Sequence, residues 1–144
     1  MAERTANAEW QGSLKEGEGT LALGSGAFEG AYSFKSRFEE GTGTNPEELI
    51  GAAHAACYSM QLSLELAEAG HDPESVRTEA KVHLTSAEGG GFEISRIELI
   101  TRGTVPGIDD DDFRKHAEVA KENCLISKAL GAVGEITLDA QFGE

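Results

Sequence analysis

Cysteine, proline and basic residues are all scarce in this 144-residue chain, which has 2 Cys, 3 Pro and 12 Lys+Arg against 26 Asp+Glu. Two cysteines are too few for a secreted disulfide scaffold. The formal net charge of −14 disfavours nucleic acid and anionic membrane surfaces as partners, because like charges repel. No run approaches the roughly 18 apolar residues of a membrane span, and residues 1–10 contain no apolar signal-peptide core. We therefore expect a cytoplasmic protein with reduced cysteines.

One domain is the simplest organisation that this composition allows. The chain is 39% hydrophobic and contains 18 glycines, which indicates a globular protein with many turns. A chain of this length buries roughly two-thirds of its unfolded surface and needs no disulfide or metal to support a core. Because no linker, repeat or shift in composition divides the chain, we expect a single domain over residues 1–144.

A change of hydrophobic period near residue 45 separates an N-terminal group of strands from a long helix. Residues 5–38 are rich in Gly, Thr, Ser and aromatics in short alternating runs, which predicts two or three strands. Asn45 then stands where a helix N-cap belongs, with Pro46 in the first helical position and Glu48 in the third, a capping-box arrangement. Gly70 is the expected end of the helix.

The two halves of this helix differ in character. Residues 49–57 are small and apolar nearly all round, which predicts close neighbours on several sides. The second half is amphipathic, and a single polar stripe at helical spacing comprises His54, Tyr58, Gln61, Glu65 and Glu68.

The rest of the chain alternates between strand and helix patterns. The expected elements are a strand over 76–85, a second strand over 92–105 that completes a hairpin, a helix after residue 108 with an acidic first turn, a helical turn over 127–131 and a strand over 136–142. This order predicts an α+β fold with an antiparallel-rich sheet.

Cys57 lies in the middle of the long helix and is the first candidate for chemistry. Free cysteine is among the most buried residue types, so Cys57 and Cys124 both have a plain interpretation as small core residues. Burial raises the pKa of a thiol and makes it inert, and reactivity therefore requires a nearby cation. Lys35 and Arg37, on one face of a strand expected over residues 32–38, are candidates, although Arg37 also fits an ordinary solvated charge.

Glu47 and Glu48 fit the first turn of the helix, where acidic side chains are favoured. Glu47 stands ten residues before Cys57, about 15 Å along one helix axis, so it cannot contact Cys57 of its own chain. If both belong to one site, a symmetric dimer must bring Glu47 from the partner chain, or the site must be spread out.

His54 raises two other chemical hypotheses. With Cys57 it forms an i, i+3 pair that could bind a metal, yet a tetrahedral site needs three or four ligands and the other histidines fall on separate elements. A Cys–His hydrolase needs a base at hydrogen-bonding distance from an exposed nucleophile, and His54 is roughly 60° around the helix from Cys57. No glycine motif for phosphate binding follows a strand. His54 is more simply the head of the polar stripe, and we expect no metal.

Two segments carry a family resemblance. Residues 34–39 read Phe-Lys-Ser-Arg-Phe-Glu, and residues 43–57 read Gly-Thr-Asn-Pro-Glu-Glu-Leu-Ile-Gly-Ala-Ala-His-Ala-Ala-Cys. With matches at 105–108, 123–127 and 135–139, they closely resemble the osmotically inducible protein C (OsmC) branch of the OsmC/Ohr thiol peroxidases over essentially the whole chain. His54 is typical of the OsmC branch, since the organic-hydroperoxide-resistance branch usually has Tyr there. Leu125 departs from the family, whose members often carry Pro after the second cysteine.

The resemblance implies a fold and a set of site residues. The family fold is an intertwined homodimer in which antiparallel-rich sheets surround a long central helix from each chain, with two sites at the subunit interface. By motif match, Cys57 is the peroxidatic thiol and Cys124 the resolving thiol. Arg37 and Glu47 are the groups that activate Cys57, and Glu48 is an alternative carboxylate partner for Arg37.

The resemblance also implies an activity. Organic hydroperoxides, and hydrogen peroxide less efficiently, are reduced through a Cys57 sulfenic acid and a Cys57–Cys124 disulfide, in defence against oxidative and osmotic stress. An external dithiol, such as a lipoylated protein, restores the thiols, and no metal, haem, flavin or other cofactor is required. The contrasting hypothesis is a non-enzymatic ligand-binding or structural dimer with buried cysteines, in which Arg37 and Glu47 form an interface ion pair.

Overall fold

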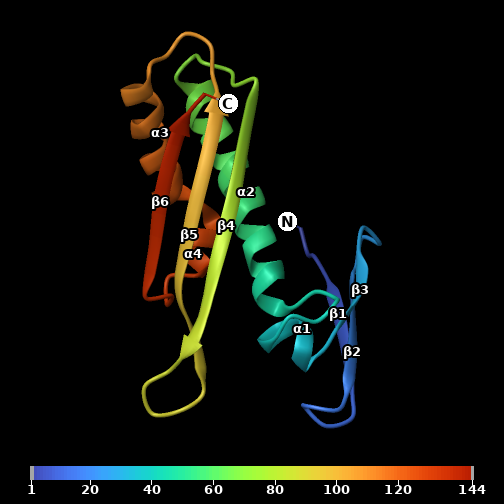
Figure 1. The fold of residues 1–144 in the computed structure, drawn as a ribbon. Coiled ribbons are helices and arrows are strands. Elements are labelled where there is room, and N and C mark those ends of the chain that lie inside the picture. Colours follow the sequence, from blue (N-terminus) through green and yellow to red (C-terminus); the bar gives the residue numbers. More distant parts are fainter. Residues whose placement is uncertain (1, 144) are drawn as a thin grey trace. The chain divides into compact units, whose positions relative to one another are not determined.

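The computed structural model describes residues 2–143, which fall into two units that divide between Leu49 and Ile50. In the N-terminal unit, β1 (Ala6–Gln11), β2 (Glu18–Leu23) and β3 (Glu29–Tyr32) form an antiparallel sheet in the order β1-β2-β3 (Figure 1). The prediction of two or three strands in this part of the chain is confirmed.

Residues Phe34–Phe38 form a short helix, α1, so the prediction that Arg37 lies on a strand is wrong. Ser33 caps this helix through two reciprocal bonds. The Ser36 N–H donates to Ser33 Oγ at 3.1 Å, and the Ser33 N–H donates to Ser36 Oγ at 2.8 Å. Such local bonds satisfy the N–H groups that open a helix and compete with strand pairing. The strand β3 therefore ends at Tyr32, before the alternating sequence pattern does.

The long helix α2 spans Pro46–Glu68, close to its predicted bounds. At its start, the Glu48 N–H donates to Asn45 Oδ1 at 2.8 Å, which confirms Asn45 as the N-cap. At its end, Gly70 has φ of +89°, and the N–H of the following residue donates to Leu66 O at 2.9 Å. These features form a Schellman motif, in which a glycine in the left-handed region ends the helix.

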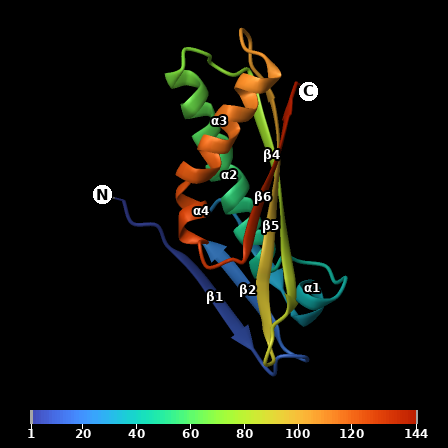
Figure 2. The ribbon, with the colours of Figure 1, turned by 90° about the vertical axis from the view of Figure 1, so that its left-hand side faces the viewer.

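In the C-terminal unit, helices cover one face of a three-stranded sheet (Figures 1 and 2). β4 (Ser75–Ser86) and β5 (Phe92–Thr104) form the expected long antiparallel hairpin, and β6 (Glu135–Phe142) pairs with β5 in parallel. The helical layer contains most of α2, with α3 (Asp110–Asn123) and α4 (Leu125–Ala129). The predicted α+β class is confirmed.

The core of this unit lies between the helices and the sheet, and its largest fully buried side chains include Tyr58, Leu62, Leu66, Ile97, Leu99 and Phe113. Two members of the polar stripe, His54 and Tyr58, are fully buried. The Tyr58 hydroxyl donates to Ala117 O at 2.8 Å, so this buried polar group is satisfied. On the other side of α2, Met60 and Leu64 are 75% and 49% exposed.

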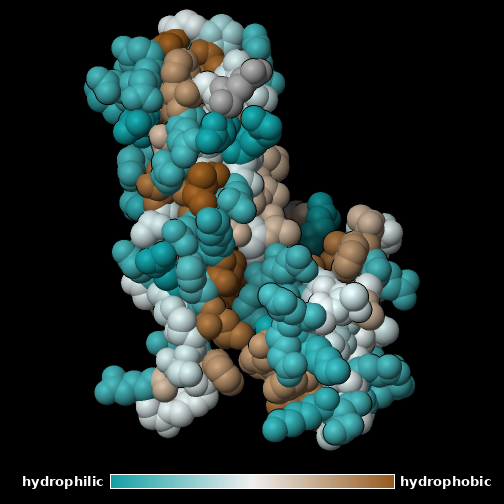
Figure 3. All heavy atoms as spheres, viewed as in Figure 1, coloured by the Kyte–Doolittle hydropathy of each residue, from teal (hydrophilic) through white to brown (hydrophobic). Residues whose placement is uncertain are grey.

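The surface seen in Figure 3 is covered mainly by hydrophilic side chains, in keeping with the net charge of −14. Within residues 2–143, none of the helices combines the length and the apolar character needed to cross a bilayer.

Candidate active site

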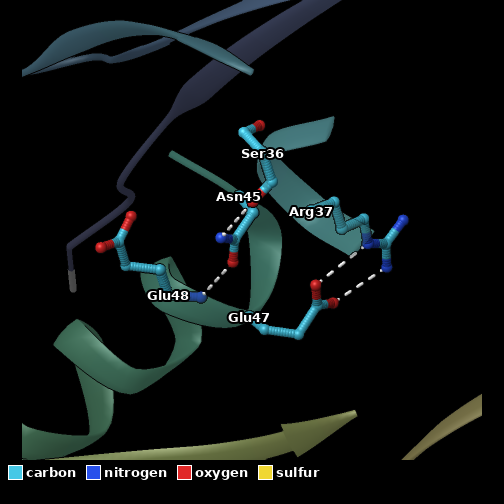
Figure 4. A network of polar contacts seen from close by, with 5 residues as sticks. All are labelled: Ser36, Arg37, Asn45, Glu47 and Glu48. Atoms are coloured by element: carbon cyan, nitrogen blue, oxygen red, sulfur yellow. Dashed lines mark hydrogen bonds and ion pairs between the residues drawn. The ribbon is translucent and has the colours of Figure 1, made fainter. Parts of the chain in front are cut away.

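Arg37 and Glu47 form a bidentate ion pair in the N-terminal unit, and Figure 4 shows the two side chains pointing toward each other. Arg37 Nε donates to Glu47 Oε1 at 3.0 Å, and Nη2 donates to Oε2 at 2.9 Å. Two parallel bonds fix the plane of the guanidinium. The hydrogen bonds to Glu47 also raise the pKa of Arg37. Glu47 is buried, whereas the Arg37 side chain is 37% exposed, which leaves part of the guanidinium accessible to a further partner.

The connection between α1 and α2 holds this pair in place. Asn45 Nδ2 donates to Ser36 O at 3.0 Å, and Ser36 Oγ donates to Thr44 O at 2.7 Å. Because Ser36 is next to Arg37 and Asn45 caps α2, these bonds tie the start of α2 to α1 (Figure 4). The Asn-Pro-Glu-Glu motif thereby places Glu47 opposite the guanidinium.

Glu48 has a different partner. Its Oε2 accepts a hydrogen bond from Thr44 Oγ1 at 2.7 Å, and Figure 4 shows its side chain directed away from Arg37. Its N–H donates to Asn45 Oδ1, as the predicted capping box requires, but its carboxylate binds Thr44 in place of the reciprocal bond to the Asn45 N–H. The structure thus pairs Arg37 with Glu47 and leaves Glu48 as a helix-start residue.

Cys57 and Cys124 contact each other in the C-terminal unit. Cys57 is half-buried on α2, and Cys124 is fully buried at the junction where α3 ends and α4 begins. Both are free thiols, and a hydrogen bond joins their side chains. The fold therefore brings together two thiols that lie on different helices.

The surroundings of Cys57 act on its thiol in opposite directions. Burial raises the pKa of Cys57, and Cys124 acts in the same direction. The backbone N–H groups of Ile126 and Leu125 donate to the Cys57 sulfur and oppose this rise in pKa. They belong to the first turn of α4, where backbone N–H groups have no partner within the helix. Because the thiolate is the nucleophile, Cys57 needs a further cation to react rapidly at neutral pH.

His54 lies one turn before Cys57 and is fully buried. Its Nε2 lies 2.7 Å from Ser127 Oγ. Burial lowers the pKa of His54, so the ring is neutral at neutral pH and is not the cation that Cys57 requires. Among the described residues, no three His, Cys, Asp or Glu side chains gather into a metal-binding group.

An apolar pocket lies beside Arg37 within the N-terminal unit. It has a volume of about 360 Å³, and its aromatic lining consists of Trp10, Tyr32, Phe34 and Phe38. The Arg37 guanidinium carbon lies 5.2 Å from the centre of the Phe38 ring, within the range of a cation–π contact. The pocket therefore combines an apolar wall with one accessible cation.

The four predicted site residues fall into two pairs, with Arg37 and Glu47 in one unit and Cys57 and Cys124 in the other. Two features of the site were not predicted from the sequence. Ser127 falls at the start of the helical turn expected over residues 127–131, and no local signal links it to His54. The aromatic pocket joins residues from separate strands and α1, and only a known strand register would have revealed it.

Comparison with known proteins assigns the chain to a family. Residues 39–139 match the model of the family described as OsmC-like protein, and the chain belongs to this family. The chain is 48% identical to the peroxiredoxin OsmC of Escherichia coli over 140 residues, which cover 96% of each protein. It is 31% identical to the organic hydroperoxide resistance protein of Xanthomonas axonopodis pv. citri over 68% of this chain and 67% of that one.

Solved structures show the same fold. An organic hydroperoxide resistance protein from Elizabethkingia anophelis aligns over 99% of both chains with a TM-score of 0.76 and 24% identity. A second such protein, from Legionella pneumophila, aligns over the full length of both chains with a TM-score of 0.73 and 21% identity. The resemblance noted in the sequence is therefore confirmed at the level of family and fold.

Proposed function

We propose that this protein is a cysteine-based peroxidase that reduces organic hydroperoxides, and hydrogen peroxide less efficiently, in defence against oxidative and osmotic stress. The observation that carries the proposal is the contact between two free thiols, Cys57 and Cys124, on separate helices. The names of the relatives support it, since they are a peroxiredoxin and an organic hydroperoxide resistance protein.

In the first step, the Cys57 thiolate attacks the outer oxygen of the hydroperoxide. The O–O bond breaks, Cys57 becomes a sulfenic acid, and the alkoxide takes a proton to leave as an alcohol. Arg37 stabilises both the thiolate and the negative charge that develops on the leaving oxygen. Glu47 holds the guanidinium plane through its two hydrogen bonds.

In the second step, the Cys124 sulfur attacks the sulfenic acid. A disulfide forms between Cys57 and Cys124, and water leaves. The existing contact between the two side chains supports closure of this bond. An external dithiol, such as a lipoylated protein, then reduces the disulfide by thiol–disulfide exchange, which regenerates both thiols and leaves the dithiol oxidised.

A homodimer is part of the proposal because Glu47 and Cys57 are separated by about 15 Å along one helix axis. An exposed apolar stripe on α2 supports such a dimer. It follows helical spacing and consists of Ala53, Ala56, Met60, Leu64 and Ala67. We place this stripe against the partner chain, with Arg37 and Glu47 of one chain serving Cys57 of the other. Each chain then acts as one OsmC-like domain in the cytoplasm.

The aromatic pocket supports the preference for organic hydroperoxides. A phenyl or alkyl group gains from burial against Trp10, Tyr32 and Phe34, while the peroxide oxygens reach Arg37. Hydrogen peroxide lacks the apolar group and gains nothing from this wall.

The proposal is tested by mixing protein with a small excess of cumene hydroperoxide and measuring the peroxide that remains. With dihydrolipoamide present, the wild type should consume peroxide continuously, and Cys57→Ser should consume none. Without added thiol and with one equivalent of peroxide, Cys124→Ser should consume the peroxide and form a sulfenic acid that dimedone labels. Peroxide consumption that is equal in wild type and Cys57→Ser would overturn the proposal.

A further inference from the structure

Two buried hydrogen bonds join α2 to α3 and α4, the helices on either side of Cys124. The Tyr58 hydroxyl donates to Ala117 O on α3, and His54 Nε2 bonds to Ser127 Oγ on α4. Only the second bond reaches the segment that follows Cys124. It spans 73 positions of the sequence, so it links two separate parts of the fold.

The His54–Ser127 bond stands one helical turn from each cysteine. His54 is three residues before Cys57 on α2, and Ser127 is three residues after Cys124 on α4. Cys124 makes no side-chain capping bond to α4. The N–H groups of Leu125 and Ile126 hold the first turn of α4 to the Cys57 sulfur, and the His54–Ser127 bond adds a second directional contact between α2 and α4. The apolar contacts of α4 are non-directional, whereas a hydrogen bond fixes the orientation of the helix.

Burying His54 has a cost that packing alone does not explain. Its Nδ1 is buried and has no hydrogen-bond partner among the described residues. An unpartnered buried polar atom destabilises a fold, and an apolar side chain of similar size avoids this cost. The ring is also neutral, so it supplies no charge to the Cys57 thiol. The remaining contribution that His54 can make is its directional hydrogen bond to Ser127.

We propose that His54 and Ser127 form a positioning pair that holds Cys124 against Cys57, so that the sulfenic acid closes to the disulfide before further oxidation. This inference rests on the proposed peroxidase function. The Cys57 sulfenic acid has two competing fates. Attack by Cys124 forms the disulfide and releases water, whereas a second hydroperoxide transfers an oxygen to give the sulfinic acid and releases an alcohol.

Loss of the pair changes the balance between these two fates. Without the His54–Ser127 bond, α4 samples orientations in which Cys124 is misaligned, and closure slows about fivefold, the factor expected for one net hydrogen bond. The first oxidation of Cys57 does not involve Cys124 as a nucleophile and depends on α4 only through the N–H groups of its first turn, so closure slows more than the first oxidation does. The sulfinic fraction at a given peroxide concentration therefore rises.

The test separates the two steps by rapid mixing of the full-length dimer with cumene hydroperoxide, acid quench and intact mass. Ser127→Ala and His54→Leu each remove the bond, and His54→Gln keeps a side-chain donor as the conservative variant. Tyr58→Phe is the matched control, because it removes the other buried hydrogen bond, which ends on α3 and not on α4. Circular dichroism before mixing establishes that each variant is folded.

We expect Ser127→Ala and His54→Leu to close the disulfide about fivefold more slowly relative to their own rate of sulfenic acid formation, and to accumulate sulfinic acid. The double variant should close no more slowly than either single variant, because both remove one interaction. His54→Gln should recover part of the closure rate, and Tyr58→Phe should match the wild type.

Wild-type closure rates and sulfinic fractions in both Ser127→Ala and His54→Leu would overturn the positioning role while leaving the peroxidase function intact. Equal slowing in Tyr58→Phe would also overturn it, because the effect would then follow general loosening of the helices. Failure of the wild type to oxidise Cys57 at all would contradict the proposed function itself.

Discussion

Glu47 holds Arg37 by two hydrogen bonds of 3.0 and 2.9 Å, whereas the adjacent carboxylate of Glu48 binds Thr44 at 2.7 Å. The two glutamates open the same helix and differ in direction. Glu47 fixes the orientation of the Arg37 guanidinium, and Glu48 accepts a hydrogen bond within the turn before the helix. This difference between neighbours of the same residue type provides a matched pair of variants.

Glu47→Gln should slow the oxidation of Cys57. The amide accepts one hydrogen bond from Arg37 but loses the charge and the second acceptor. We expect the second-order rate constant with cumene hydroperoxide to fall about tenfold or more, because hydrogen bonds to charged groups contribute about 1.5–3 kcal/mol. Stopped-flow kinetics measures it. Glu48→Gln is the control and should keep the wild-type constant, while equal losses in both variants would assign the effect to the helix start.

Leu125→Pro should raise the pKa of Cys57. The Leu125 N–H donates to the Cys57 sulfur and counteracts the rise in pKa that burial causes. Proline has no N–H, and it is well tolerated at the first position of a helix, which Leu125 occupies in α4. The thiolate fraction below the pKa therefore falls.

The measurement is the pH dependence of iodoacetamide labelling, with the Cys57 peptide followed by mass spectrometry. The midpoint of the Leu125→Pro variant should move to higher pH, and Leu125→Ala, which retains the N–H, should keep the wild-type midpoint. A midpoint that is unchanged or lower in Leu125→Pro would show that this N–H does not stabilise the thiolate.

His54 should make the fold less stable below about pH 6.5, the ordinary pKa of histidine. Burial lowers the pKa of His54 in the folded protein, so the unfolded chain binds a proton more readily as the pH falls. Where the unfolded state binds more protons than the folded state, the free energy of unfolding falls as the pH falls. The loss is at most about 1.4 kcal/mol for each pH unit.

Urea unfolding between pH 7.5 and about 5, a window that starts above the ordinary histidine pKa, measures this effect. The wild type should lose free energy of unfolding across it, and His54→Gln should lose less, because its side chain does not titrate. Parallel curves for the two proteins would mean that the pKa of His54 is not lowered by folding.

Met60→Asp should break the proposed dimer. Met60 is 75% exposed in the single chain and lies at the centre of the apolar stripe on α2. An unpaired carboxylate buried in an interface costs about 3 kcal/mol or more, so the dimer dissociation constant should rise at least about a hundredfold.

Light scattering after size exclusion gives the oligomeric state, and peroxide consumption should fall with dissociation. Val119→Asp is the control, since Val119 is also exposed, at 45%, but lies on α3. A Met60→Asp protein that remains dimeric and fully active would place the interface elsewhere.

Elements with strong local signals could be predicted from the sequence. Asn45, Pro46 and Gly70 define the ends of α2 because caps act through nearby backbone groups. The β4–β5 hairpin follows from alternation and a glycine turn. The short helix α1 was missed because aromatic residues in an alternating run favour a strand, whereas the reciprocal bonds of Ser33 and Ser36 determine the local structure.

The site could be predicted only in part. Motif resemblance selected Arg37, Glu47, Cys57 and Cys124, and helix geometry alone separated Glu47 from Cys57. The choice between Glu47 and Glu48 depends on side-chain direction at the turn, which sequence spacing does not fix. The partner of His54 lies 73 positions away, and no periodicity connects residues across that distance.

Cys57 and Cys124 form the redox-active pair of the proposed mechanism. The decisive measurement is to treat the reduced wild type with one equivalent of cumene hydroperoxide, block free thiols and identify the linked peptides by mass spectrometry. We expect a single disulfide within one chain between Cys57 and Cys124, with a mass loss of two hydrogen atoms. Full consumption of the peroxide with both cysteines still free to alkylate would contradict it.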